Sequence, residues 1–339
     1  MYVNVGNDSF QVSRNGEYVD KSGLIAVINA TLQTERQFTC VTRSRRFGKS
    51  MAAKMLCAYY DQSCDSHRLF EDLEIARHPS FEQHLNKYPV IYLDLTAFIT
   101  EQKDSGIVDT IQQAIKDDVI AAWPDVAITG SDTLRQALFK VWEFTGRKFI
   151  FIIDEWDAIC REYEADTTVM DRYIDWLRQM FKDAMGTRIF AGVYMTGILP
   201  IKKYKAQSAL NNFREYSMVE PRRLASYFGF TKDEARLLSE KYNMDFDELA
   251  NWYDGYQIGD EPSMFNPNSV MQAIDSGHCE SYWAATAAYD LVARHIQMNY
   301  EGLKDDIIRM LAGGKCKVNP TGFQNDLSDI RSRDDVLTV

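Results

Sequence analysis

The stretch FTCVTRSRRFGKSMAAKMLCAYYD (residues 38–61) decides the fold. It begins with a β-rich run over 38–42 and continues through a basic, turn-like segment. Residues 49–61 then predict a helix, because strong helix formers combine with apolar residues that recur on one face. A strand, a loop and a helix in this order are the parts of a P-loop, in which backbone N–H groups at a helix N-terminus surround phosphate. The stretch therefore predicts a phosphate-binding loop at residues 42–50.

The Gly-Lys-Ser tripeptide at the end of this loop carries the expected contacts. Gly48 lets the backbone approach a phosphate, Lys49 reaches the β- and γ-phosphates of ATP, and the Ser50 hydroxyl binds Mg²⁺. The full pattern has glycine where this chain has Arg43, and the tripeptide alone recurs by chance, so the strand and helix around it are the confirming context. The alternative is a basic, solvated turn that caps a helix. The predicted nucleotide-binding residues are Arg45, Arg46, Phe47, Gly48, Lys49, Ser50 and Met51.

The second cluster is FIFIIDEWD (149–157), an apolar run that ends in acidic residues. A P-loop ATPase places an aspartate at the end of a buried strand, where it holds Mg²⁺, and Asp154 has that position. Glu155 follows directly and is predicted to polarise the attacking water as a general base. Alone, Asp154 would more often be a strand-end turn or a helix cap. Asp157 is predicted to cap the segment that follows.

The third cluster is YMTG (194–197), which ends another apolar run. Thr196 would stand at the carboxyl edge of the sheet, near the γ-phosphate or the attacking water. It therefore joins Glu155 and Lys49 as a catalytic candidate. On sequence alone, a threonine that starts a turn before glycine is an equally good interpretation.

Several other residues invite roles with less support. The N-terminal residues Phe10, Arg14 and Tyr18 are a suggestion for adenine contacts, because the base is usually held by segments that flank the core. The aromatic segment 251–259 is interpreted as a packed turn. The basic residues after the third cluster are interpreted mainly as solvated side chains, although an arginine there could sense the γ-phosphate; they are Lys202, Lys203, Lys205, Arg222 and Arg223.

Strand and helix patterns alternate around these clusters. Further strands are predicted over 89–98, 148–154 and 188–197, and helices over 106–122, 131–144 and 169–185. This alternation predicts an α/β fold, a P-loop NTPase with a mainly parallel sheet flanked by helices. The extra strand between the first two clusters, with a glutamate beside the aspartate, favours the ATPase branch with an inserted sheet strand over the GTPase and kinase-like branch.

A chain of 339 residues exceeds the usual size of a single core, so several domains are expected. Residues 1–225 are predicted to form the P-loop ATPase core and 226–300 a smaller helical lid domain. Its helices are expected over 231–243, 245–254, 268–276 and 280–298. Residues 301–339 are predicted to start a further helical or winged-helix-like region, which the final apolar run suggests is truncated.

Composition limits the class of protein. The net charge of −11 argues against a protein that coats nucleic acid along its whole surface, although a local basic patch remains compatible. Six scattered cysteines without a C-x-x-C pair fit free thiols in a reducing compartment, and the five histidines have no metal-ligand spacing. No signal peptide or membrane span is recognisable. We therefore predict a cytoplasmic protein without a membrane partner.

The chain resembles the bacterial AAA-ATPase-like family, whose members often carry a PD-(D/E)XK nuclease-like domain at the C-terminus. The resemblance covers nearly the whole chain. The family's phosphate loop typically reads R-P-R-R-F-G-K-S, so the missing first glycine is a family trait, and Ser44 stands where the family has proline. The matching motifs are YVDKSGLI (18–25), TRSRRFGKS (42–50), YPVIYLDL (88–95), FIIDEWD (151–157), MTGILPI (195–201), ALNNF (209–213), YFGFTKDE (227–234), WYDGYQIG (252–259), FNPNSV (265–270) and YWAAT (282–286).

The resemblance implies an ATP-binding core, with Lys49 and Ser50 at phosphate and Mg²⁺ and Asp154–Glu155 as the second motif. It also implies a nuclease-like region beyond residue 339, through which nucleic acid would be a partner. No nuclease signature lies within the chain itself. An oligomer is compatible with the family, but no residue is recognisable as an arginine finger.

Two classes of function follow. In the first, Mg-dependent ATP binding and hydrolysis move the helical lid and serve a nucleic-acid-directed partner domain. In the second, the chain is a nucleotide-gated binding or regulatory module with little or no hydrolysis. Glu155 favours the first class, and the crowded basic loop leaves room for the second. A purely structural scaffold would require all three clusters to occur in this order by coincidence.

Overall fold

The structure is a computed structural model that describes residues 1–101, 106–163, 165–201, 210–282 and 302–311, together with the separate positions 300, 316, 318 and 332–334. The chain divides into two compact units. The first unit contains Met1–Arg43, Gly48–Gly197 and Ile201–Ser217, and the second contains Ser44–Phe47, Ile198–Pro200 and Met218–Val339. The predicted domain limits at 225 and 300 stay predictions.

The first unit is built on a five-stranded sheet with the order β2-β3-β4-β1-β5, in which every neighbouring pair is parallel. The α/β fold predicted from the sequence is confirmed. In space, β4 is the strand inserted between β1 and β3, whereas β2 lies at the edge of the sheet. The bounds are β1 Phe38–Thr42, β2 Val90–Asp94, β3 Phe149–Asp154, β4 Phe190–Gly197 and β5 Arg214–Tyr216.

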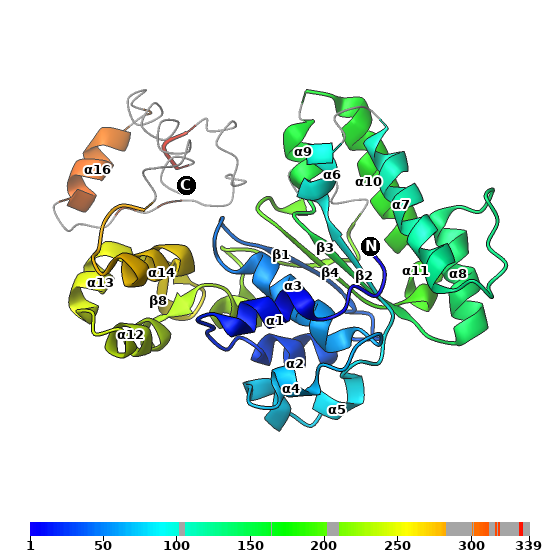
Figure 1. The fold of residues 1–339 in the computed structure, drawn as a ribbon. Helices are drawn as coiled ribbons and strands as arrows, with labels where there is room; N and C mark the ends of the chain where they lie inside the picture. The colour runs from blue at the N-terminus through cyan, green and yellow to red at the C-terminus, as the bar shows by residue number, and fades with distance from the viewer. Residues whose placement is uncertain are drawn as a thin grey trace. The chain divides into compact units, whose positions relative to one another are not determined.

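Helices cover both faces of this sheet (Figure 1). On one side lie α1 Asp8–Asn15, α2 Gly23–Asn29, α3 Lys49–Tyr60, α4 His67–Phe70, the 3₁₀ turn Glu74–Arg77 and α5 Phe81–His84. On the other lie α6 Leu95–Glu101, α7 Ile107–Ala122, α8 Leu134–Thr145, α9 Ala158–Glu162, α10 Thr167–Phe181 and α11 Ala184–Ile189. Because both faces are covered, β1, β3 and β4 are buried along their whole length, which explains their continuous apolar runs.

The two faces of β3 have different surroundings. Phe149, Phe151 and Ile153 belong to the large apolar cluster that also contains residues of α7, α8 and α10. Side chains alternate along a strand, so Asp154 points to the opposite face. That face is covered by α3, which contacts β2, β3 and β4. The alternation therefore directs Asp154 towards α3, the helix that follows the predicted phosphate loop.

Several predicted bounds in this unit differ from the structure, and three of the differences have a local cause. The predicted strand over 89–98 ends at Asp94, and α6 begins directly after it. The predicted helix over 169–185 is interrupted, because the Asp183 side chain accepts the N–H groups of Met185 and Gly186 and so starts α11. The strand predicted from residue 188 starts at Phe190, where α11 ends.

The second unit contains a three-stranded antiparallel sheet with the order β6-β8-β7, which the sequence analysis missed. The segment interpreted as a packed turn instead contains the end of a helix and the strand β7. Gly259, at a φ of +61°, begins the two-residue turn between β7 and β8. The bounds are 3₁₀ Arg222–Tyr227, β6 Phe230–Thr231, α12 Lys232–Lys241, α13 Phe246–Tyr253, β7 Asp254–Ile258, β8 Glu261–Phe265, α14 Pro267–Ser276 and α16 Leu303–Leu311.

Two expectations lie mainly outside the described residues: the helix over 280–298 and most of the region over 301–339. Within the described ranges, no helix is long and apolar enough to span a membrane.

Candidate functional site

The three predicted clusters lie at one edge of the first unit's sheet. Thr42 pairs with Gly197, and Ile153 pairs with Met195, so the ends of β1, β4 and β3 are adjacent. On the outer side of β3, Asp94 pairs with Asp154. The carboxyl edge of a parallel sheet is where such folds bind ligands.

The loop after β1 leads into α3 through two residues with left-handed backbone conformations. Arg46 has a φ of +68°, and Gly48 has a φ of +85° and forms the N-cap of α3. A Cβ on Gly48 would meet nothing within 4 Å, so the backbone conformation, not lack of space, favours glycine. A non-glycine residue such as Arg46 in this region is strained by about 1 kcal/mol or more. The Arg45 and Arg46 side chains are exposed.

Lys49 is the buried cation of the site, with only 4% of its side chain exposed. Its Nζ donates a hydrogen bond to the Arg43 carbonyl at 3.1 Å and lies 3.9 Å from Glu155 Oε1. Burial lowers the pKa of Lys49, while the carboxylates of Glu155 and Asp154 oppose that shift. The first and second predicted clusters therefore meet through this ammonium group.

Asp154 is 2% exposed and lies beside Ser50. Burial raises the pKa of Asp154 to about 6, a hydrogen bond from Ser50 opposes the rise, and the Glu155 and Asp94 carboxylates add to it. Tyr92 also donates a hydrogen bond to Asp154. Hydroxyl and carboxylate oxygens are ligands that Mg²⁺ accepts, so the pair Ser50–Asp154 fits the predicted magnesium site.

No group of three or more His, Cys, Asp or Glu side chains is placed to hold a metal in the described part of the chain. Magnesium is usually held by one or two protein groups together with substrate phosphates, so the Ser50–Asp154 pair matches that mode of binding.

Asp154→Asn is expected to stabilise the chain without metal by about 1–3 kcal/mol at pH 8, because it removes a buried charge whose pKa lies near 6 instead of 3.8. The raised pKa means that the wild-type carboxyl favours folding only when protonated. The advantage of the variant should therefore shrink as the pH falls through 6 towards 4. Urea unfolding at pH 8 and pH 5 measures this, with the exposed Asp125→Asn as control. A variant less stable than wild type at both pH values would contradict the prediction.

Glu155 stands in a strained turn, with a φ of +53°. Its Oε2 accepts a hydrogen bond from Arg161 Nη2 at 2.9 Å, and its Oε1 faces Lys49. The side chain is 21% exposed. The predicted general base thus lies next to the predicted phosphate-binding lysine and remains partly open to solvent.

Thr196 is fully buried near the end of β4, and its carbonyl accepts the N–H of Trp156 at 2.9 Å. Its hydroxyl has no hydrogen-bond partner among the described residues, and the same holds for the hydroxyls of Thr42 on the adjoining strand β1 and of Tyr194 on β4 itself. A buried hydroxyl without a partner is destabilising by about 1–3 kcal/mol. Such groups are candidates for contact with a bound ligand or water.

Two predicted contacts cannot involve the side chains named. The Phe47 side chain is fully buried in a cluster with Ala225, Ile258 and Met264, all within the second unit. Only the Phe47 backbone is therefore left for a nucleotide. Phe10 is also fully buried and stacks on Phe70, so it is not available to an adenine ring. Met51, by contrast, is 41% exposed.

The sequence analysis missed Arg161, Tyr92 and Asp94, which contact or adjoin the acidic pair. The signals available were the motif YLDL, which places an acid at the end of β2, and the i,i+4 spacing of Asp157 and Arg161. Asp157 occupies the N-cap position of α9, as predicted, but its side chain makes no capping hydrogen bond and pairs with Arg161 instead.

The other basic candidates belong to the second unit or lie outside the described residues. Lys202, Lys203 and Lys205 fall outside them. Arg222 pairs with Glu220 at 3.6 Å in the second unit. Both arginines of the 222–223 pair belong to the second unit.

The turn after β3 packs closely against Gly197. A Cβ at this position would overlap Asp157 Oδ1 and lie 2.6 Å from Trp156 Cδ1. Gly197→Ala is therefore expected to destabilise the chain by about 1–3 kcal/mol, because the Trp156–Asp157 turn must move. Thermal unfolding tests this, with Gly130→Ala as control, since a Cβ there meets nothing within 4 Å. Equal stability of both variants would show that the turn adapts freely.

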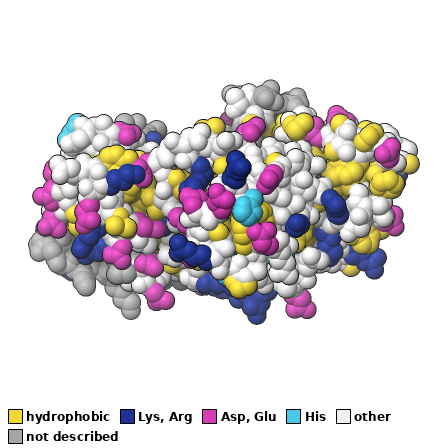
Figure 2. Space-filling view, turned by 60° about the horizontal axis from the view of Figure 1, so that its bottom comes forward, with side chains coloured by type: hydrophobic (Ala, Val, Ile, Leu, Met, Phe, Trp, Pro, Cys, Tyr) yellow, Lys and Arg dark blue, Asp and Glu magenta, His cyan; other side chains and the backbone are white. Residues whose placement is uncertain are grey.

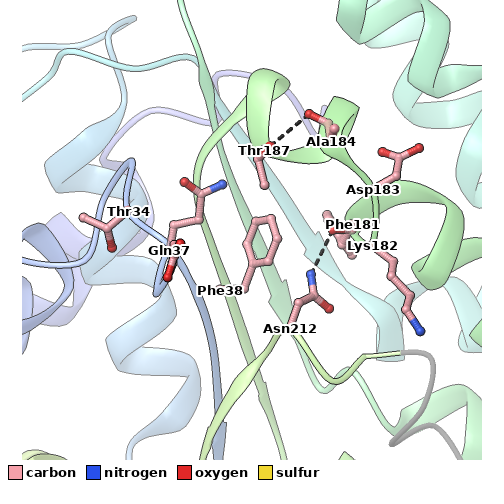
Figure 3. A pocket seen from close by; sticks show the side chains of 10 residues that line it. Thr34, Gln37, Phe38, Phe181, Lys182, Asp183, Ala184, Thr187 and Asn212 are labelled. Atoms are coloured by element: carbon pink, nitrogen blue, oxygen red, sulfur yellow. Dashed lines mark hydrogen bonds between the residues drawn. The ribbon is translucent and has the colours of Figure 1, made fainter.

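A hollow of about 300 Å³ lies elsewhere in the first unit (Figure 3). Its lining includes Phe38 at the start of β1 and Phe181 at the end of α10, so it lies at the sheet edge opposite the predicted phosphate loop. Two of its polar groups serve the fold: Asn212 Nδ2 donates to the Phe181 carbonyl at 2.9 Å, and Asp183 caps α11. The hollow adds no group to the candidate site.

Comparisons with known proteins extend these observations. A family model described as "Predicted AAA-ATPase" matches residues 4–206, a range that includes every predicted site residue. A protein of Azotobacter chroococcum mcd 1, described as "Uncharacterized protein in vnfD 5'region", is 24% identical over 298 residues. The match covers 83% of this chain and 53% of that protein, so the chain spans about half the length of this relative.

Proposed function

Because the chain belongs to the AAA-ATPase-like family of predicted ATPases, we propose that it binds ATP together with Mg²⁺ and hydrolyses the nucleotide. Family membership, which the sequence motifs predicted, is confirmed and supports ATP binding. Hydrolysis, the roles of single residues and any coupling to a partner belong to this proposal.

One observation carries the proposal: the end of the phosphate loop meets the acidic pair after β3. Ser50 is hydrogen-bonded to Asp154, and Lys49 lies 3.9 Å from Glu155. These residues are about a hundred positions apart in the sequence, and their meeting in the fold supports the proposed reaction, which would use both pairs. A helix cap or a solvated turn would not require this meeting.

Each residue then has a separate role. Lys49 and the backbone of residues 45–51 hold the phosphates, with the exposed Arg45 and Arg46 adding positive charge. Ser50 and Asp154 would hold Mg²⁺, which when bound neutralises charge on the phosphate oxygens. Glu155 takes a proton from the attacking water, and the Thr196 hydroxyl orients that water or the γ-phosphate.

The loop could also transmit nucleotide binding to the second unit, which contains the predicted lid. Residues 44–47 belong to that unit, while the chain on both sides of them belongs to the first. Within the second unit, Asn266 Nδ2 donates to the Arg45 carbonyl at 3.4 Å, and the Gly229 N–H donates to the Phe47 carbonyl at 3.2 Å. We propose that a change of loop conformation on nucleotide binding moves the second unit.

A nucleic-acid-directed partner domain beyond residue 339, a cytoplasmic location and an oligomer stay predictions. On the face shown in Figure 2, acidic and basic side chains of the described residues are interspersed. A mixed surface of this kind does not favour binding of nucleic acid by that face.

The second candidate function is a nucleotide-gated module with little hydrolysis. It is favoured by the strained Glu155, whose carboxylate is already engaged by Arg161 and Lys49. A base held in this way must be released before it can act.

Two measurements on the same preparation decide between these functions. Equilibrium binding of Mg-ATP tests the site, and release of inorganic phosphate tests the chemistry. Binding with turnover supports the ATPase, binding without turnover supports the gated module, and no binding by folded protein would refute both.

A further inference from the structure

Four side chains of alternating charge follow one another in the first unit. Asp157 pairs with Arg161, Arg161 Nη2 donates to Glu155 Oε2 at 2.9 Å, and Glu155 Oε1 lies 3.9 Å from Lys49 Nζ. The two oxygens of Glu155 thus face two different cations. The contact with Arg161 is within hydrogen-bond distance, whereas the contact with Lys49 is not.

Arg161 is itself held firmly. Its partner Asp157 is fully buried and lies four residues earlier, at the start of the same short helix α9. Burial opposes the charge of Arg161, but the carboxylates of Asp157 and Glu155 together raise its pKa. The guanidinium is therefore a fixed positive group that can hold the carboxylate of Glu155 in one orientation.

Without the hydrogen bond from Arg161, the carboxylate of Glu155 would still face one cation, Lys49. Lys49 is buried, and the Arg43 carbonyl that accepts its hydrogen bond is uncharged. Opposite charges attract more strongly where burial limits screening by water, as it does around Lys49. Glu155 would then close onto Lys49 and compete with an incoming phosphate for the same ammonium group.

We propose that Arg161 is a positioning residue that keeps Glu155 away from Lys49 and so leaves Lys49 available to phosphate. This inference rests on the proposed function, because it assigns Lys49 to phosphate and Glu155 to the attacking water. It adds Arg161, which belongs to none of the sequence motifs. It also implies that the hydrogen bond from Arg161 to Glu155 affects nucleotide binding as well as hydrolysis.

A double-mutant cycle on nucleotide affinity tests the proposal. The probe is a non-hydrolysable ATP analogue with Mg²⁺, measured calorimetrically with wild type, Arg161→Gln, Glu155→Gln and the double variant. Arg161→Gln should weaken binding on the order of tenfold when Glu155 is present and less than about twofold in the Glu155→Gln background. Arg161→Lys should restore most of the loss, and Arg178→Gln, which removes a surface pair with Asp175, should change nothing.

The same loss in both backgrounds would reduce Arg161 to a structural role, and no loss in either would also overturn the proposal. A second readout needs no nucleotide. In a crystal structure of nucleotide-free Arg161→Gln, the distance between Lys49 Nζ and Glu155 should close from 3.9 Å to hydrogen-bond range. An unmoved Glu155 would refute the inference even if ATP did not bind. Failure of wild type to bind Mg-ATP would refute the proposed function, and the distance would still decide whether Arg161 keeps Glu155 away from Lys49.

Discussion

Glu155→Gln is expected to lower the rate of ATP hydrolysis by about a hundredfold to ten-thousandfold while Mg-ATP still binds. A glutamine keeps the size and one hydrogen-bond acceptor of the side chain, but it cannot take a proton from water, and general-base catalysis contributes about that much to a rate. The structure supports this assignment, because Glu155 lies beside Lys49 and is 21% exposed. Phosphate release under single-turnover conditions measures the chemical step, and calorimetry measures binding.

The matched control for this substitution is Glu162→Gln, which changes an exposed glutamate at the end of α9. It should hydrolyse ATP at the wild-type rate. If Glu155→Gln also kept the wild-type rate, the general base would be another residue. If wild type itself bound Mg-ATP without turnover, the gated module would replace the ATPase as the function of this chain.

Lys49→Ala should weaken Mg-ATP binding by roughly tenfold to more than a hundredfold. A hydrogen bond to a charged group contributes about 1.5–3 kcal/mol, which corresponds to that loss of affinity. The ammonium of Lys49 is buried, so water does not screen its contact with phosphate as it does on the surface. Titration calorimetry with Mg-ATP measures the effect.

Lys87→Ala provides the control, because Lys87 is exposed and precedes β2, at the end of that strand away from Asp94. Its affinity for Mg-ATP should equal that of wild type. Thermal unfolding should show that Lys49→Ala still folds, since the substitution removes a buried cation whose pKa is already lowered by burial. Wild-type affinity in Lys49→Ala would place the phosphates elsewhere.

The strands could be predicted well where both faces of the sheet are covered. Residues 38–42 form β1 with the predicted bounds, and β3 begins one residue after its predicted start, because a doubly buried strand must be apolar throughout. The same reasoning predicted a strand longer than β2, because the apolar residues after Asp94 continue into α6 and pack in the core there. Burial does not distinguish a strand from a buried helix in a short apolar run.

In the second unit, the sequence analysis missed a β-hairpin because helical patterns surround it. Residues 254–265 contain two short strands around a turn at Gly259, but their alternation is brief and the helices on either side dominate the pattern. The third strand, β6, pairs with β8 across a long stretch of sequence, as in the pairing of Phe230 with Phe265. Such pairing is not visible in local periodicity.

Sequence motifs by themselves determined the chemical candidates: Lys49, Ser50, Asp154 and Glu155 are recognisable because a strand, a glycine turn and a helix are local structures. Only the tertiary structure decided how these groups meet. It inserted β4 between β1 and β3, joined Ser50 to Asp154, and gave Glu155 a second cation in Arg161. The physical reason is that strand order and ion pairing follow from the packing of residues far apart in the chain, whereas a motif reports only on its own neighbours.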